Sequence, residues 1–468
     1  MATPTLELAD VQGLVVSGYG KMHESRWLLL GVRDAVAARS WLAGIARRVT
    51  TSEAPEERWC VNVAITSEGL RALGVAEPDL QTFAAPFVEG MAAEHRRHVL
   101  GDVGPSAPEH WAWGRPDVPD RAVHVLLLLY ATDLGALGAL LDEVRPGIAA
   151  GGLEVVHELR PEPLPGQGSA ALPDQKFGIE HFGFADGMSQ PIVAGTGQEA
   201  NVGGDEARRS VIAAGEFVLG YPNGYGERTP APRLDGDDDF GRNGTYLVVR
   251  QLSQDVAGFW RYLDAQTKGP DGSTDAEAQV RLGAKLVGRW PSGAPLVRSP
   301  HRDDPDLGAD NAFQYADRDP HGERCPLGSH IRRTNPRDSL GTNPRKALEL
   351  ANLHRIVRRG RVYGPGLDRT EPDDGQERGL LFACLNANLD RQFEFVQHTW
   401  CNNPKFDRLY DEQDPLLGNS VAPGSFTVQD RPFRRRVQGV PSFVTTRGGA
   451  YFFLPGVRAL RRLAAMDA

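Results

Sequence analysis

The order of apolar strands and amphipathic helices limits the folds open to this chain more than any other feature. Residues 26–34 (RWLLLGVRD) have the continuous apolar content of a buried strand, and Asp34 is placed to cap the helix that follows. Strands are predicted again over 58–66, 122–131 and 152–159, with a second amphipathic helix between the last two. This alternation predicts α+β structure, in which helices cover a sheet with antiparallel neighbours.

A similar order returns in the second half of the chain. Strands are predicted over 216–221 (EFVLGY) and 244–252 (GTYLVVRQL), and the second of these runs into an amphipathic helix. Residues 378–386 (RGLLFACLN) predict a further strand followed by a helix, and 441–456 has the pattern of a closing hairpin. Two ferredoxin-like halves explain this duplication, although their sequences are not alike enough to be called a repeat.

The length of the chain also indicates more than one domain, since 468 residues exceed what a single hydrophobic core usually holds. We expect an N-terminal domain over 1–175, a connecting segment over 176–215 and a C-terminal domain over 216–468. Long segments rich in Gly, Pro and Asp are uncommon in compact domains unless they build a site. They interrupt the predicted elements at 160–176, 222–243, 291–324 and 363–377.

Charge and cysteine content narrow the class of protein. The net charge of −9 argues against a nucleic-acid partner, which needs a basic face. The four cysteines lie far apart without a Cys-x-x-Cys pair, so neither a zinc site nor a covalently attached haem is indicated. The N-terminus has no pattern of a secretion signal, and the most apolar run, 123–131, is too short to cross a bilayer. We therefore expect a soluble cytoplasmic protein with reduced thiols.

A first candidate site lies in residues 177–191, FGIEHFGFADGMSQP. Gly183 and Gly187 relieve the backbone around Asp186, so its carboxylate can point into a pocket from a tight bend. The same spacing also occurs in ordinary turns, so this stretch alone leaves both interpretations open.

A second candidate site lies in residues 324–338, RCPLGSHIRRTNPRD. The arginines that follow His330 disfavour its protonated form, which keeps a ring nitrogen available for a metal, and their guanidiniums can bind carboxylates. Haem needs both features, an axial base and cations for its two propionates. A histidine hydrogen-bonded within a basic loop is the alternative.

A third candidate site lies in residues 353–366, LHRIVRRGRVYGPG. In an extended segment Arg358 shares a face with Ile356, so its guanidinium can enter an apolar pocket. A buried guanidinium requires an anion or another acceptor. An exposed basic strand edge is the alternative.

Together the three stretches resemble the dye-decolorizing peroxidase family. GFADGMSQP resembles its Gly-x-x-Asp-Gly signature, CPLGSHIRRTNPR the segment with the proximal haem histidine, and IVRRGRVYGPG the segment with the distal arginine. Residues 10–22 and 378–406 are similar to the family's opening strand and to its late strand and helix, so the resemblance covers nearly the whole chain in order. Chain length and large loops look like the larger subgroup, often called class V or types C and D. Met188 stands where a branched aliphatic residue is expected, a mild departure.

The resemblance implies a fold and a cofactor. The fold is α+β, with two ferredoxin-like domains of the dimeric α+β barrel superfamily enclosing one noncovalent haem b per chain. His330 is implied as the axial iron ligand, with Asp186 and Arg358 on the opposite, distal face. Glu394 is expected to accept the other ring N–H of His330.

Further contacts to the haem follow from the same resemblance. Arg332, and then Arg337, are expected to bind the propionates. Leu380 and Phe382 are expected to form part of the distal wall, although ordinary core packing explains these two side chains nearly as well.

The implied function is a haem peroxidase that uses hydrogen peroxide to oxidise dyes, phenolics and other aromatic reductants through an oxyferryl intermediate. Asp186 would carry the peroxide proton, and Arg358 would stabilise the charge on the departing oxygen, with acidic pH favoured. Bulky dyes would deliver electrons through a surface Trp or Tyr, for which Trp400, Tyr363 and Tyr410 are unranked candidates.

Two other functions compete with the peroxidase. One is a haem-handling or haem-sensing protein with incidental peroxidase activity, which needs His330 but no distal acid and guanidinium pair. The other is an anion-binding α+β protein without haem. We expect hydrogen peroxide and an aromatic reductant as partners, no nucleic acid or membrane, and a monomer or homodimer.

Overall fold

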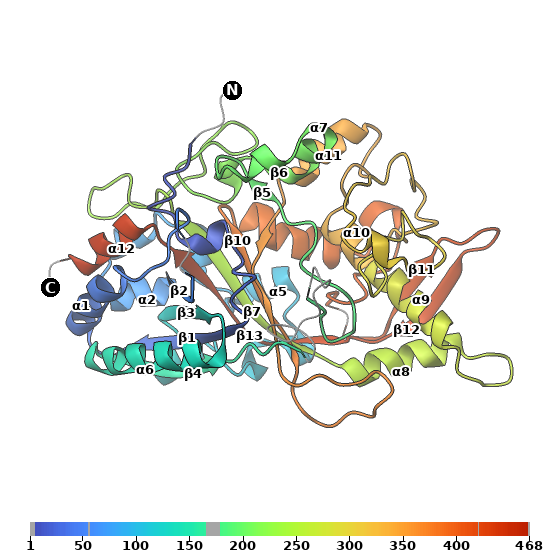
Figure 1. Ribbon diagram of the computed structural model, residues 1–468, viewed down its shortest axis with the longest axis horizontal. Coiled ribbons are helices and arrows are strands. Elements are labelled where there is room, and N and C mark those ends of the chain that lie inside the picture. Colours follow the sequence, from blue (N-terminus) through green and yellow to red (C-terminus); the bar gives the residue numbers. More distant parts are fainter. Residues whose placement is uncertain (1–4, 55–56, 165–177, 420, 467–468) are drawn as a thin grey trace.

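The N-terminal half of the chain forms a four-stranded antiparallel sheet. The computed structural model describes residues 5–54, 57–164, 178–419 and 421–466 (Figure 1). The sheet has the order β4-β1-β3-β2. Its strands are β1 (Glu24–Val32), β2 (Trp59–Ile65), β3 (Val125–Ala131) and β4 (Leu153–Leu159).

Two helices complete the ferredoxin-like βαββαβ order of this half. α1 (Ala35–Ile45) follows β1, and α6 (Leu134–Ala150) follows β3. The carboxylate of Asp34 accepts hydrogen bonds from the N–H groups of Val36 and Ala37, so the predicted helix cap is confirmed.

The C-terminal half repeats this topology with different lengths. Its order is β13-β7-β10-β8, and β9 also pairs with β10. The strands are β7 (Thr245–Gln254), β8 (Val357–Arg358), β9 (Arg361–Tyr363), β10 (Gly379–Asn386) and β13 (Val444–Leu454). β13 meets β2 at the pair Phe453 and Ile65, so the two sheets join into one in the described part of the chain. The predicted duplication of ferredoxin-like halves is confirmed.

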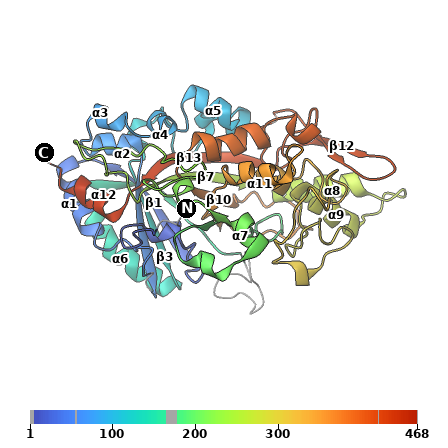
Figure 2. The same cartoon turned by 90° about the horizontal axis from the view of Figure 1, so that it is seen from above.

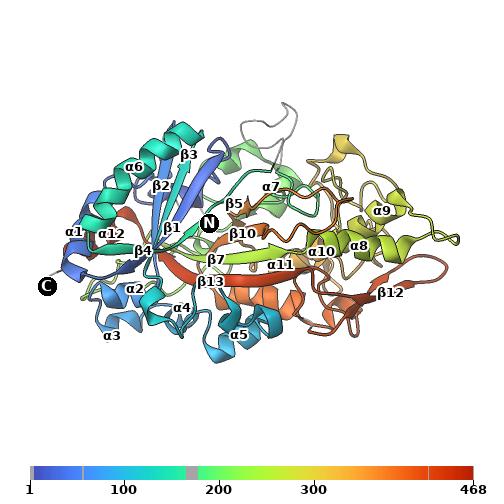
Figure 3. The ribbon, with the colours of Figure 1, turned by 90° about the horizontal axis from the view of Figure 1, so that it is seen from below.

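The helices of the second half occupy the expected places. α8 (Val256–Thr267) follows β7, capped by Asp255, and a π-helical segment formed by η9 (Asp390–Glu394) and η10 (Val396–Cys401) follows β10. In all three views α1, α6 and α12 (Val457–Ala464) lie at one end of the molecule. α8, α9 (Ala276–Val287) and the hairpin of β11 (Gly424–Val428) and β12 (Arg435–Val440) lie at the other end (Figures 2 and 3).

The connections carry shorter elements. Two of them matter for the site, namely α10 (His330–Thr334) and α11 (Pro344–Asn352). The others include α2 (Ser67–Ala72), α3 (Glu77–Leu80), α4 (Ala85–Glu89), α5 (Glu94–Leu100), β5 (Ile192–Val193), α7 (Gly204–Ser210) and β6 (Val211–Ile212). Among the described residues no helix is both long and apolar enough to span a membrane.

Both faces of the N-terminal sheet are buried. Along β1, Leu28 and Leu30 belong to one apolar cluster, whereas Trp27 and Leu29 belong to a second cluster on the opposite face. This arrangement explains why the strand is continuously apolar in sequence instead of alternating with polar residues.

Two predicted elements are wrong. Residues 216–221 are not a strand: the short helix η7 (Ala214–Glu216) and a turn replace it, because the Glu216 carboxylate is held by Arg391 at 2.6 Å and by the N–H of Gly224. Residues 441–456 are not a hairpin but the single long strand β13. Its glycines serve close packing, since a Cβ at Gly448 would lie 2.4 Å from the indole nitrogen of Trp113.

The predicted domain limits are not settled by this architecture. The boundary between 175 and 176 lies outside the described residues, as does much of the predicted loop 160–176. The division into 1–175, 176–215 and 216–468 stays a prediction.

Candidate active site

Asp186 sits on a tightly tied bend. Its N–H donates to the carbonyl of Gly178 at 2.8 Å, and the N–H of Ala185 donates to the carbonyl of Pro291. Gly183 and Gly187 have φ values of 92° and 90°, a conformation that L side chains rarely adopt, which explains both glycines. The bend therefore holds the carboxylate in one place relative to the surrounding sheet.

A second carboxylate, that of Glu180, is hydrogen-bonded to the backbone of the same bend. Glu180 accepts hydrogen bonds from the N–H groups of Phe182 and Phe184, and from the side-chain amide of Gln254 at 2.7 Å. Burial raises the pKa of Glu180 to about 7, although these hydrogen bonds oppose the rise. Gln254 is the last residue of β7, so Glu180 ties the bend to the C-terminal sheet.

Arg358 reaches Asp186 from the short strand β8. The register of β8 against β10 places Arg358 opposite Cys384. Its Nη1 donates to Oδ1 of Asp186 at 2.8 Å, and its Nη2 donates to the carbonyl of Met188 at 2.7 Å. Burial alone would raise the pKa of Asp186, but the Arg358 charge and the Gly187 N–H outweigh it, so the pKa lies below its ordinary value. The pair is a carboxylate and a guanidinium held together and partly exposed to a cavity.

His330 begins α10 and is oriented by a buried carboxylate. Its Nδ1 donates to Oδ2 of Asp414 at 3.0 Å, and the Asp414 side chain is 0% exposed. The other oxygen of Asp414 accepts from the N–H groups of Leu416 and Leu417, which fixes the carboxylate. Burial alone would lower the pKa of His330, but Asp414 outweighs it and the pKa is raised, so the expectation that neighbouring arginines disfavour the protonated form is wrong. Nε2 makes no hydrogen bond among the described residues and is available to a ligand.

Asp186, Arg358 and His330 line one cavity, with about 1580 Å³ of space including its open mouth. Leu380 and Phe382 also line it, together with Met188. The mostly apolar walls and the available Nε2 of His330 suit a large cofactor with a metal centre.

Three buried arginines line the same cavity without a carboxylate partner in the described part of the chain. Arg289, Arg337 and Arg355 are 4%, 5% and 9% exposed, and their acceptors are main-chain carbonyls and the side-chain oxygen of Asn311. Burial, and then the charge of Arg337, lowers the pKa of Arg355 to about 9 and that of Arg289 to about 10. Such a cluster needs an anion, which matches the two propionates of haem.

Arg332, predicted first for the propionates, does not line this cavity. It is 0% exposed, donates to a carboxylate oxygen of Asp319 at 3.1 Å and lies over the ring of Tyr315. Residues two apart in a helix point to different sides, so Arg332 points away when His330 faces the cavity. Arg337, predicted second, does line the cavity.

Glu394 does not contact His330, and that prediction is wrong. Its carboxylate accepts from the hydroxyl of Tyr451 and from Arg96, each at 2.7 Å. The carboxylate on His330 comes instead from Asp414. The two residues are 84 positions apart and Asp414 lies in an irregular loop, so no local pattern marks it.

Replacing Asp414 tests this assignment. Asp414→Asn is expected to weaken haem binding about 10- to 100-fold, because the amide is a poorer acceptor for the Nδ1 proton. The measurement is a haem titration of the apoprotein followed by its absorption band. Glu394→Gln is the matched control, since it also neutralises a buried carboxylate, and it is expected to change the affinity little. The reverse ranking of the two variants would contradict the assignment.

The arrangement of these side chains around one cavity fits a protein that binds haem. No family model matches the chain. Two curated relatives cover nearly all of it: dye-decolorizing peroxidase msp1 of Mycetinis scorodonius and the multifunctional dye peroxidase DyP2 of Amycolatopsis sp., each 30% identical. The alignments cover 98% and 93% of this chain, and 88% and 91% of the relatives.

Solved structures agree with the sequence relatives. An ancestral D-type dye-decolorizing peroxidase is 28% identical with a TM-score of 0.81, covering 99% of this chain and 100% of its own. A dye-decolorizing peroxidase in complex with 2,6-dimethoxyphenol is also 28% identical, with a TM-score of 0.77 over 98% and 100%. The chain belongs to the dye-decolorizing peroxidase family, and it is an oxidoreductase.

Proposed function

We propose that this protein uses hydrogen peroxide to oxidise dyes, phenolics and other aromatic reductants with one noncovalent haem b. The observation that carries the proposal is that one cavity holds the imidazole of His330 and the Asp186–Arg358 pair. Nε2 of His330 would bind the haem iron. Arg337 and Arg355 would hold the propionates, and Leu380 and Phe382 would form part of the wall around the ring.

Haem bound here would supply the redox centre, whose iron takes the oxidising equivalents of peroxide and passes them to the reductant. The Asp186 carboxylate would accept a proton from one oxygen of hydrogen peroxide and return it to the other, which leaves as water. The guanidinium of Arg358 would stabilise the negative charge that builds up on the departing oxygen.

A haem-handling protein remains the competing function, and the distal pair argues against it. Carrying haem requires His330 and anion partners for the propionates, but it gives no role to an ionised carboxylate held 2.8 Å from a guanidinium in the cavity. Monomer or homodimer, and a cytoplasmic location, stay predictions.

Rapid mixing of the haem-loaded protein with hydrogen peroxide tests the proposal. A peroxidase is expected to change its absorption band in proportion to peroxide and to return to the starting spectrum when a phenol is added. A haem carrier is expected to lose absorbance slowly and irreversibly. A spectrum that does not respond to peroxide would remove the proposed function.

The pH dependence of the peroxide reaction is expected to report the Asp186–Arg358 pair. The pKa of Asp186 is lowered in the folded protein, so the carboxylate is ionised above that pKa and the reaction is lost as the pH falls through it. In Arg358→Leu the positive charge that most lowers the pKa of Asp186 is gone. The pKa of Asp186 should therefore rise, and the loss of rate at acidic pH should begin at a higher pH. The measurement is the second-order rate constant with peroxide against pH for both proteins. If the rate is lost at the same pH in both proteins, Arg358 does not set the pKa of Asp186.

A further inference from the structure

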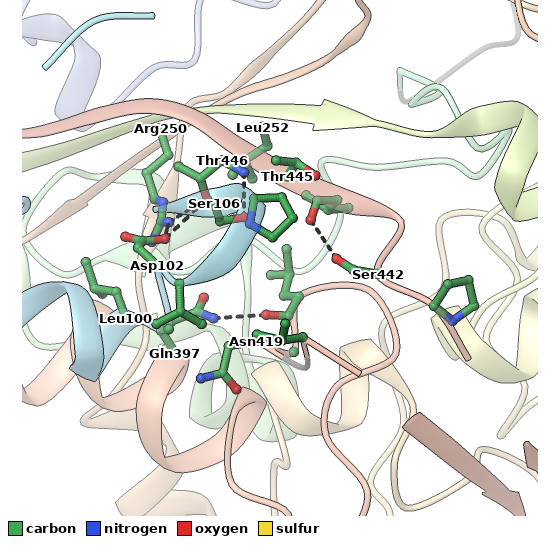
Figure 4. Close-up of a pocket in the computed structure, with 18 of the residues that line it drawn as sticks. Leu100, Asp102, Ser106, Arg250, Leu252, Gln397, Asn419, Ser442, Thr445 and Thr446 are labelled. Carbon is green, nitrogen blue, oxygen red and sulfur yellow. Dashed lines mark hydrogen bonds and ion pairs between the residues drawn. The ribbon is translucent and has the colours of Figure 1, made fainter. Parts of the chain in front are cut away.

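A second cavity, which we call the side pocket, lies directly beside the haem cavity. It has about 1040 Å³ of space including its mouth, and lies between residues 100–106, strands β7 and β13, and residues 417–419 and 421–423 (Figure 4). The two cavities share part of their walls, formed by Leu252, Phe382, Phe393, Gln397, Leu417 and Val444. A molecule in the side pocket would therefore lie one layer of side chains from the haem cavity.

The side pocket contains a buried ion pair that none of the roles above uses. The carboxylate Oδ1 of Asp102 accepts from Nη2 of Arg250, and these side chains are 2% and 6% exposed. The hydroxyl of Thr446 lies 2.8 Å from Arg250 and 3.3 Å from the same Asp102 oxygen. Figure 4 shows the three side chains together on one wall. This wall is polar but has no net charge.

The ion pair is not fully satisfied by the protein. Oδ2 of Asp102 and Nε of Arg250 are buried and make no hydrogen bond within the described residues. Leaving buried polar atoms without partners costs roughly 1–3 kcal/mol each, more for charged groups, so such atoms point to a partner from outside the chain. Asp102 and Arg250 both line the side pocket, so a small shift of either side chain would present one acceptor or one donor to a neutral polar group there.

The other residues that line the side pocket are mostly apolar and indicate the chemistry of the remaining part of the ligand. Leu100, Val103 and Pro105 lie on one side, and the aromatic rings of Phe382 and Phe393, 6.1 Å apart, belong to the wall shared with the haem cavity. A wall of zero net charge gives a charged ligand no net attraction, and a ligand without polar groups would leave the polar atoms unsatisfied. A neutral aromatic ring with a hydroxyl group matches both parts.

We propose that the side pocket binds a small phenolic reductant, with its hydroxyl on the Asp102–Arg250 pair and its ring toward the shared wall. The role of this pocket as an electron-donor site rests on the proposed peroxidase function. Oxidation there removes one electron and the hydroxyl proton from the phenol and leaves a phenoxyl radical. The electron crosses the shared wall to the haem oxidised by peroxide, and the Asp102 carboxylate takes the proton. Burial raises the pKa of Asp102 although Arg250 opposes the rise, which favours that transfer.

The test uses 2,6-dimethoxyphenol as the probe. It compares the wild type with a variant in which a larger side chain fills the side pocket but lies outside the haem cavity. Val103 lines only the side pocket, so Val103→Trp should obstruct it. Val36→Trp is the matched control, because Val36 is 57% exposed on α1 and lines neither cavity. Binding to the haem-loaded protein is measured by calorimetry without peroxide, and KM for the phenol is measured with it.

Val103→Trp is expected to raise both the Kd and the KM for the phenol about tenfold or more, whereas the peroxide rate constant and the haem band stay unchanged. Asp102→Asn, which keeps the shape of the pocket, should raise the Kd severalfold, and its melting curve shows whether it is folded. Equal Kd and KM values in Val103→Trp and Val36→Trp would overturn the proposal. If the wild type binds the phenol in the side pocket but does not react with peroxide, the proposed function fails while the binding site stands.

Discussion

His330→Ala is expected to yield a folded protein that no longer holds haem in its cavity, so the purified variant lacks the haem absorption band of the wild type. Nε2 of His330 is the ring nitrogen left available once Nδ1 is committed to Asp414. Loss of a second-sphere partner already weakens metal sites 10- to 100-fold, and loss of the ligand itself should exceed that. The measurement is the absorption spectrum after reconstitution with excess haem and gel filtration.

The cavity offers a matched control for this experiment. His354 also lines the cavity, but its Nδ1 is hydrogen-bonded to the carbonyl of Arg391. Its ring stacks on that of Phe395, with 3.8 Å between the ring centroids. His354→Ala is expected to keep the band at the wild-type position. A normal band in His330→Ala, together with its loss in His354→Ala, would assign the ligand to His354 instead.

Asp186→Asn is expected to slow the reaction with hydrogen peroxide about 10²- to 10⁴-fold while haem stays bound, the range in which general acid–base groups contribute. The amide has nearly the same shape as the carboxylate and can still accept from Arg358, but it cannot take a proton at working pH. The measurement is the second-order rate constant for peroxide by rapid mixing, with the haem band as the check on loading.

Glu180→Gln separates the two carboxylates of the bend. Glu180 lines the same cavity and its pKa is raised to about 7, so it is the other group able to exchange a proton there. Its oxygens are already taken by two backbone N–H groups and by Gln254, and we expect the variant to slow the reaction far less than Asp186→Asn. A larger loss in Glu180→Gln would transfer the proton role to Glu180.

The parts of this molecule that follow local rules were predictable from sequence. The strand over 26–34 and its helix cap at Asp34 depend on neighbouring residues only, and both are confirmed. The hairpin predicted over 441–456 is a single strand instead, and Gly448 in it allows the close approach of Trp113 from a distant segment. Residues 216–221 have strand composition, yet the ion pair of Glu216 with Arg391 decides their conformation.

The residues of the site also differ in whether a local sequence pattern marks them. Asp186, His330 and Arg358 stand in short motifs, and the structure brings all three to one cavity. Asp414 contacts His330 from 84 positions away in sequence, and Arg289 lines the cavity from outside the three motifs, so no motif marks either residue. Arg332 and Arg355 are both arginines beside a motif, and only the direction of each side chain in three dimensions tells them apart.

The buried guanidiniums of Arg289, Arg337 and Arg355 also tie folding to cofactor supply. Three like charges in a wall of low dielectric oppose the compact state until an anion neutralises them. A ligand that binds only the folded chain adds about 2.7 kcal/mol of stability at 100 times its Kd. The melting temperature of this protein should therefore rise with haem loading, and heat resistance in a cell would measure how much of it carries haem.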